Sequence, residues 1–265
     1  MCGRYTLVRG DKIKVVFNVT VPADLRLVGR YNIAPTQFAP VITNDSSQLQ
    51  LFRWGLIPSW TKKAKVRLKT AGDKAIASLE LIPDSNVATK KSQLMINARA
   101  ETLAERPAFR KALVQRRCLV PADGFYEWRK NADGSKTPMY IRMRDGEPFA
   151  FAGLWENWVD ADGASVRSFS IITTSPNELV KSIHDRMPVI VPSQGFSTWL
   201  MPGEISAEAA GSWLKPYPAE LMQAEPVGTQ VNSAKNEGSD LILPASAQPG
   251  IKHVKELPSQ PSLFE

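Results

Sequence analysis

The chain has 265 residues, of which 43% are hydrophobic and 22% are charged, as in an ordinary globular protein. This length is sufficient for one large hydrophobic core or two small ones. No apolar run reaches the roughly 18 residues of a membrane span, and the basic N-terminal segment lacks the apolar block of a secretory signal. We therefore expect a cytoplasmic protein that makes no membrane contact.

The cysteine and histidine content argues against a metal site or a disulfide framework. The two cysteines, Cys2 and Cys118, are far apart in the sequence, and the only histidines are His184 and His253. Because no C-x-x-C or similar ligand pattern occurs, we expect no metal, no cofactor and a reducing compartment. The net charge of +7 and the isoelectric point near 9.4 allow an anionic partner, although charge alone does not identify one.

Short strands and turns dominate the sequence. Alternating or continuous apolar residues predict strands or extended segments at 4–8, 30–36, 41–52 as a hairpin around 44–47, 94–96, 116–128 around a Pro-Ala-Asp-Gly turn, 139–143, 149–154 and 168–174. Helix-like spacing predicts short helices at 101–114, 177–183, 195–201 and 206–214. Many short strands with few helices favour a single mixed, sheet-rich α+β domain over a parallel doubly wound one.

Two segments stand apart from this domain, which we expect over residues 2–245. Residues 61–93 begin with six basic residues against a single acidic one and then lose clear periodicity. They predict a basic surface insertion, which is either simply solvated or an arm that contacts phosphates. Residues 246–265 are rich in Pro, Ser and Gln, so we expect a flexible C-terminal tail.

Four polar residues in apolar settings are the candidates for chemistry: Cys2, Asn97, Glu127 and His184. The common phosphate-loop, metalloprotease and serine-hydrolase motifs are absent from the sequence. Glu127 lies among aromatic residues, where burial would raise its pKa and suit it for proton transfer. The alternative for Glu127 is a partly exposed carboxylate that pairs with a neighbouring cation. The alternative for His184 is a purely structural role.

The opening residues Met1-Cys2-Gly3-Arg4 could place a reactive group at the chain end. If Met1 is removed, Cys2 carries both a free α-amine and a thiol, with unperturbed pKa values of roughly 8 and 8.5. An aldehyde can form an imine with this amine, after which the sulfur closes a thiazolidine ring. The alternative is an incidental cysteine on a frayed terminus.

Six motifs, taken together and in order, resemble one known family. They are Met-Cys-Gly-Arg at the start, Arg30-Tyr-Asn-Ile-Ala-Pro35, Trp54-Gly-Leu-Ile-Pro58 with Trp60, Ile96-Asn-Ala-Arg-Ala-Glu-Thr102, Pro121-Ala-Asp-Gly-Phe-Tyr-Glu-Trp128 and His184-Asp-Arg-Met-Pro188. This set is similar to the SOS response-associated peptidase (SRAP) family, which includes bacterial proteins and the eukaryotic abasic-site sensor. The resemblance covers residues 2–245 and implies a barrel-like SRAP-type domain.

The resemblance also implies an activity, namely covalent capture of abasic sites in single-stranded DNA. By this resemblance Cys2 is the nucleophile that forms a thiazolidine crosslink after Met1 removal. His184 would help to open the sugar, Glu127 would transfer protons, and Asn97 would hold the N-terminus or a sugar oxygen. We therefore expect an abasic-site DNA-protein crosslinking enzyme that acts as a monomer and is associated with the nucleoid if bacterial.

DNA contacts are expected from cations and aromatic rings around this site. Arg4, Arg99 and Arg186 are the candidates for phosphate contacts. The candidates for stacking on bases, or for wedging a strand at a single-strand to double-strand junction, are Trp54, Trp60, Phe109 and Trp128. For these rings a place in the core is the competing interpretation, except for Trp60, whose loop setting favours exposure.

Two functions of other classes use the same residues and stay open. A cysteine peptidase or N-terminal-nucleophile hydrolase could expose Cys2 by cleaving off Met1. A single-strand binding module could bind abasic DNA without forming a bond. The sequence also leaves open an associated lyase activity and the roles of residues 61–93 and of the tail.

Overall fold

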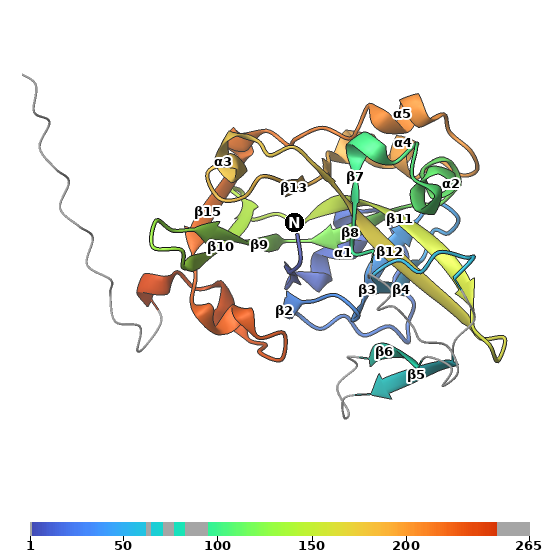
Figure 1. The fold of residues 1–265 in the computed structure, drawn as a ribbon, viewed down its shortest axis with the longest axis horizontal. Helices are drawn as coiled ribbons and strands as arrows, with labels where there is room; N and C mark the ends of the chain where they lie inside the picture. The colour runs from blue at the N-terminus through green and yellow to red at the C-terminus, as the bar shows by residue number, and fades with distance from the viewer. Residues whose placement is uncertain (1, 62–64, 71–76, 83–94, 248–265) are drawn as a thin grey trace, which may run out of the picture.

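The computed structural model describes residues 2–61, 65–70, 77–82 and 95–247 (Figure 1). The strands are β1 (Tyr5–Leu7), β2 (Arg30–Ile33), β3 (Phe38–Thr43), β4 (Leu49–Trp54), β5 (Lys65–Thr70), β6 (Ala77–Ile82), β7 (Asn97–Arg99), β8 (Arg117–Ala122), β9 (Gly124–Lys130), β10 (Lys136–Met143), β11 (Phe149–Val159), β12 (Ser165–Thr174), β13 (Met187–Pro188), β14 (Ile190–Val191) and β15 (Met222–Pro226). The α-helices are α1 (Ile13–Val16), α2 (Pro107–Gln115), α3 (Glu178–Lys181), α4 (Phe196–Trp199) and α5 (Ala207–Gly211). The 3-10 helices are η1 (Gly10–Lys12), η2 (Ala100–Thr102), η3 (Ser193–Gly195), η4 (Ala219–Leu221), η5 (Thr229–Asn232), η6 (Ser239–Ile242) and η7 (Ala245–Ala247).

Five strands close into a barrel. In the order β12, β4, β3, β8 and β11 each strand pairs with the next, and β11 pairs again with β12. The β12–β4 pair is parallel, whereas the other pairs of the ring are antiparallel. A closed ring leaves its member strands without free edges. The prediction of a sheet-rich, barrel-like α+β fold is confirmed.

Aromatic side chains fill the core because each barrel strand points alternate residues inward. Trp54 is fully buried and stacks on Phe169 with ring centroids 6.3 Å apart. Tyr5, from outside the ring, meets Trp54 edge-on at 5.2 Å and Phe151 at 5.7 Å. The N-terminal strand is therefore packed directly against the barrel core.

A second sheet has the order β15, β10, β9, β1 and β2, and the chain passes from the barrel into it directly where β8 leads into β9. The two strands predicted around the Pro-Ala-Asp-Gly turn are present, but Pro121 and Ala122 belong to β8, and Asp123 forms a bend that carries the chain into β9. A Cβ atom at Gly124 would lie 2.3 Å from the Tyr140 ring, so only glycine fits at this crossing.

The predicted helices are present but shorter than the sequence suggested. The helix expected at 101–114 is divided into η2 and α2, because Pro107 occupies the first position of α2. Proline suits this position and keeps the preceding Arg106 extended, with ψ of 122°. Asn177 and Ser206 cap α3 and α5 by accepting hydrogen bonds from Val180 N and Ala209 N.

The basic segment 61–93 contains regular structure that its sequence did not reveal. Strands β5 and β6 pair antiparallel in their own sheet, with Lys65 opposite Ile82 and Thr70 opposite Ala77. In Figure 1 this pair lies at the lower edge of the molecule, beneath β3 and β4. The rest of the segment lies outside the described residues, as does the predicted tail apart from residues 246 and 247, which belong to η7.

Candidate active site at the N-terminal strand

The pairing of β1 with β9 brings the N-terminal residues beside Glu127. Tyr5 lies opposite Phe125, and the amide of Tyr126 donates to the Arg4 carbonyl at 3.0 Å. Continued in the same register, the antiparallel pairing places residues 2–4 alongside residues 126–128. Cys2 is fully buried there, and its Sγ lies 3.9 Å from the Arg4 carbonyl oxygen.

Asn97 reaches the N-terminal segment from β7. Its Nδ2 donates to the Cys2 carbonyl oxygen at 2.8 Å, while its Oδ1 is buried and accepts no hydrogen bond from any described residue. The sequence predicted a strand at 94–96 with Asn97 just beyond it, whereas β7 covers Asn97–Arg99 and pairs in parallel with β12. Asn97 is therefore held within the strand.

Trp54 supports this strand and does not face solvent. Its Nε1 donates to the Ile96 carbonyl at 2.9 Å, directly before Asn97, and its ring is fully buried. The amide of Leu56 adds a bond to the Met95 carbonyl at 3.1 Å. No ring face of Trp54 is open to a base, so the suggestion that it stacks on DNA is wrong and the core interpretation holds.

His184 enters the site from the end of α3. Its amide donates to the Val180 carbonyl at 2.8 Å, and its Nε2 lies 3.9 Å from Oε2 of Glu127. On the opposite side of the ring, Nδ1 accepts the amide hydrogen of Arg186 at 3.0 Å. This hydrogen bond requires an unprotonated Nδ1, which leaves the proton of the neutral ring on Nε2, facing Glu127.

Burial governs the ionisation of the three titratable groups. Glu127 is only 2% exposed, and burial raises its pKa to about 7. Burial, with the nearby Glu127 carboxylate as a smaller contribution, raises the pKa of the Cys2 thiol far above its usual value. Burial also lowers the pKa of His184 and favours the neutral imidazole. Near neutral pH the site therefore combines a thiol, a carboxyl group that readily gains or loses a proton, and a neutral imidazole.

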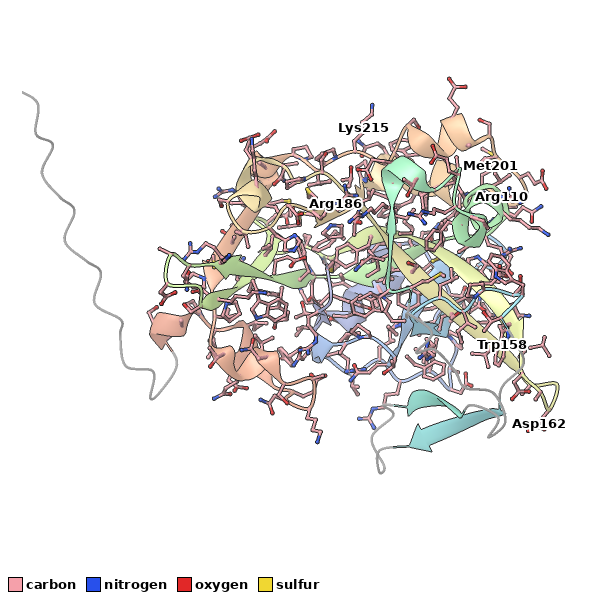
Figure 2. The ribbon with its side chains drawn as sticks, viewed as in Figure 1. Arg110, Trp158, Asp162, Arg186, Met201 and Lys215 are labelled. Atoms are coloured by element: carbon pink, nitrogen blue, oxygen red, sulfur yellow. The ribbon has the colours of Figure 1, made fainter. Side chains whose placement is uncertain are left out.

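The three arginines expected to contact phosphates differ in their surroundings. The Arg4 guanidinium is half-buried and donates to Asn32 Oδ1 at 3.0 Å and to the Val231 carbonyl at 2.7 Å. Arg186, which Figure 2 labels in the interior of the view, forms a two-pronged ion pair with Glu101 at 2.7 and 2.9 Å. Arg99 is exposed. Of the three, Arg99 is the most accessible to a phosphate in this state.

The other aromatic candidates also divide into core and surface. Phe109 is 8% exposed and packs in the core beneath α2, so it offers no stacking face. Trp60 is 60% exposed. Trp128 is half-buried, and its Nε1 donates to Asn232 Oδ1 at 2.7 Å. Trp60 and Trp128 remain the candidates for base stacking.

Two residues that support the site were not selected from the sequence. Asp123 was interpreted only as a turn residue, although its carboxylate anchors the N-terminal strand by accepting from Thr6 Oγ1 and Val8 N at 2.5 Å and from Arg9 N at 2.8 Å. Glu101 holds Arg186. The signal for Glu101 was the polar alternation of Asn97, Arg99 and Glu101, whereas Asp123 stood out only as a carboxylate between two apolar strands.

Neither a metal centre nor a membrane helix is evident in the described part of the chain. Within residues 2–61, 65–70, 77–82 and 95–247, no three His, Cys, Asp or Glu side chains are grouped to bind a metal ion. Among the same residues no helix has the length and apolar character needed to cross a bilayer.

Known proteins share both the sequence and the fold of this chain. The family described as SOS response associated peptidase (SRAP) matches residues 1–234. The chain is 42% identical over 247 residues to the abasic site processing protein YoqW of Bacillus subtilis (strain 168), covering 91% of this chain and 99% of YoqW. It is 27% identical over 254 residues to the abasic site processing protein YedK of Escherichia coli (strain K12), covering 92% and 100% of the two chains.

A solved structure is similar to the whole domain. The crystal structure of a protein from Bacteroides thetaiotaomicron matches with a TM-score of 0.74 and 29% identity, covering 92% of this chain and all of that chain. The matched family region includes Cys2, Asn97, Glu127 and His184. This chain therefore belongs to the SRAP family.

Proposed function

We propose that this protein processes abasic sites in single-stranded DNA by forming a thiazolidine crosslink through Cys2. The observation that carries the proposal is the convergence of four residues from separate elements on the N-terminal segment: Cys2, Asn97, Glu127 and His184. The similarity to YoqW and YedK, which are named as abasic site processing proteins, supports the choice of substrate.

Removal of Met1 is the first requirement of this reaction. With Met1 attached, the nitrogen of Cys2 belongs to an amide and cannot attack an aldehyde. Once freed, the α-amine adds to C1 of the ring-opened sugar to give a carbinolamine, which loses water to give an imine. The hydrogen bond from Asn97 to the Cys2 carbonyl would hold this amine in place.

Ring closure then joins the Cys2 sulfur to the same carbon. The thiol adds across the protonated imine, so that a sulfur–carbon bond forms and the nitrogen becomes a neutral secondary amine. The thiol proton is released in this step. Glu127, with its pKa raised to about 7, is suited to accept that proton and, in its acid form, to supply the one needed for loss of water.

His184 and Asn97 are suited to the sugar. The cyclic hemiacetal must open before C1 becomes an aldehyde, and this step moves a proton between two oxygens. A neutral His184 whose Nε2 lies 3.9 Å from Glu127 could exchange protons with both the sugar and the carboxyl group. The buried Oδ1 of Asn97 offers an acceptor to the freed amine or to a sugar hydroxyl.

DNA binding would use the accessible cation and rings around this centre. Arg99 is exposed two residues after Asn97, and Trp60 and Trp128 present ring surface to solvent. Stacking on aromatic rings tolerates any base, which suits a protein that must recognise the absence of a base in any sequence context.

The decisive test is incubation with single-stranded DNA that carries one abasic site, followed by denaturing gels and intact mass. We expect a stable adduct with the natural aldehyde and none with a tetrahydrofuran analogue. Cys2→Ala should remove the stable adduct, and Glu127→Gln should slow its formation by about 100-fold or more. Cys118→Ala is the matched control and should react at the normal rate, because the resemblance assigns Cys118 no part in the reaction.

The rival functions give different results in the same assays. A stable adduct with Cys2→Ala, or with an additional N-terminal tag, would contradict the thiazolidine mechanism. Retained affinity for abasic DNA without any covalent product would favour a binding module. Loss of Met1 in the absence of an aminopeptidase, together with cleavage of a general peptide library, would favour a peptidase.

A further inference from the structure

We propose that Glu101 and Arg186 are positioning residues that fix the tautomer of His184, an inference that rests on the proposed role of His184. Neither side chain is placed on the substrate in this proposal. They act on the imidazole through the backbone of Arg186. The chain of contacts runs from Glu101 to Arg186, then to His184 and finally to Glu127.

The first contact is an ion pair across the end of β12. Glu101 follows β7 and Arg186 precedes β13, and these two strands pair with β12 on either side of Thr173. Both terminal nitrogens of Arg186 donate to the Glu101 carboxylate, at 2.7 and 2.9 Å, and Nη2 also donates to the Thr173 carbonyl at 2.7 Å. The Arg186 side chain is only 15% exposed. This fork geometry is the most directional ion pair available to an arginine.

The second contact links the anchored arginine to the imidazole. The amide of Arg186 donates to His184 Nδ1 at 3.0 Å. Because the Arg186 side chain is tied to Glu101 and Thr173, its backbone N–H is held in the direction of Nδ1. Nδ1 must then be unprotonated, and Nε2 carries its proton toward Glu127.

A competing contact favours the opposite tautomer. Oδ1 of Asp185 lies 2.9 Å from the same Nδ1, and a carboxylate there would attract a proton onto that nitrogen. The Asp185 side chain is 87% exposed and so can turn into solvent. Other charged groups that act on His184 include Glu127 from β9 and Lys136 from β10. At Nδ1 the Arg186 amide and Asp185 favour opposite tautomers, and in this proposal the amide prevails only while the Arg186 side chain stays anchored.

Nitrogen-15 NMR of the imidazole rings tests this directly, because the chain has only two histidines. In a His253→Gln background, recorded above the pKa of His184, we expect the Nε2–H tautomer to predominate. Glu101→Gln should shift the tautomer ratio about fivefold toward Nδ1–H, the size expected for loss of one partly exposed ion pair. Arg186→Lys keeps the charge but not the fork and should shift the ratio in the same direction.

The control is Glu105→Gln, which makes the same charge change four residues later on an exposed side chain. It should leave the ratio unchanged. With abasic DNA, Glu101→Gln should lower the saturating rate of adduct formation in proportion to the fraction of the Nε2–H tautomer that is lost. This loss is less than fivefold because that tautomer predominates, and the half-saturating DNA concentration should not change.

An unaltered tautomer ratio in both Glu101→Gln and Arg186→Lys would overturn the inference, as would a slower reaction without a tautomer shift. The NMR measurement needs no DNA, so it is independent of the proposed function. If the unaltered protein forms no adduct, the proposed function fails while the tautomer result still stands or falls separately.

Discussion

Glu127 shows what a single buried carboxyl group does to both stability and reactivity. In the folded protein the Glu127 carboxyl group keeps its proton up to a pH of about 7, whereas an unburied glutamate releases its proton near pH 4.5. Between these values the folded chain binds more protons than the unfolded chain, so the free energy of unfolding falls as pH rises. The full difference is worth about 3 kcal/mol. The contribution is therefore fully present below pH 4.5 and lost above about pH 7.

Glu127→Gln should consequently stabilise the protein in alkaline solution while slowing adduct formation. Because an amide does not ionise, the variant avoids the cost of a buried charge. We expect its free energy of unfolding to exceed that of the unaltered protein by up to about 3 kcal/mol near pH 8.5. The excess should shrink toward zero at about pH 4.5, and urea denaturation at the two pH values measures it. Glu105→Gln, on an exposed side chain, should show no such pH dependence; an equal effect of Glu127→Gln at both pH values would mean that the Glu127 pKa is not raised.

For single residues, the sequence predicts which side chains could take part in chemistry better than it predicts which groups surround them in the fold. The aromatic neighbours of Glu127 correctly indicated its burial, because bulky rings exclude water. The ring of Trp54 and the guanidinium of Arg186 could not be assigned in the same way. Their partners, the Ile96 carbonyl and Glu101, are distant in the sequence and depend on how β7 and β13 flank β12.

Among the elements, the N-terminal strand depends on one side chain at the junction between the two sheets. β1 has only three residues, too few to be stable by pairing alone. The Asp123 carboxylate receives three hydrogen bonds, from Thr6, Val8 and Arg9. These bonds hold the strand at the position from which the preceding residues reach Glu127.

Asp123→Asn should therefore loosen the site without altering any of its four residues. An amide has one acceptor oxygen in place of two, so either the Thr6 hydroxyl, which donates to Oδ1, or the two backbone amides, which donate to Oδ2, lose this acceptor, at a cost of about 1 to 3 kcal/mol. We expect faster hydrogen exchange in β1 and a slower rate of adduct formation. Asp24→Asn changes the same group on an exposed side chain and serves as control. Unchanged exchange in β1 would contradict the anchoring role of Asp123.

Strand and turn positions were largely readable from the sequence, whereas their pairing was not. Asp-Gly pairs mark the turns at Gly134, Gly146 and Gly163 in the sequence, and all three glycines have the positive φ that such turns favour. The division of the helix before α2 was missed, although Pro107 is its physical cause. Closure of the barrel depends on β12 pairing with both β4 and β11, which no local pattern encodes.

For the whole molecule, we expect the positive charge of β5 to affect DNA binding and not the rate of the reaction. Lys65, Arg67 and Lys69 lie in β5, which belongs to neither of the two large sheets. Replacing all three with threonine should raise the DNA concentration needed for half-saturation, because the net charge of +7 becomes less positive. The rate at saturating DNA should not change, because Cys2, Asn97, Glu127 and His184 come from other elements. A slower saturating rate would show that β5 takes part in the reaction.

The burial of Cys2 also places a time limit on the maturation of the protein. Tyr5 pairs with Phe125, 120 residues later in the chain, so β1 stays accessible until β9 has been synthesised. At about 5 to 20 residues per second, this interval is roughly 6 to 24 seconds. Once β1 has paired, Cys2 is buried at 0% exposure, so we expect methionine removal to be fastest before this pairing. Under the proposed mechanism, the fraction of molecules able to react would then depend on a competition, during synthesis, between methionine removal and folding.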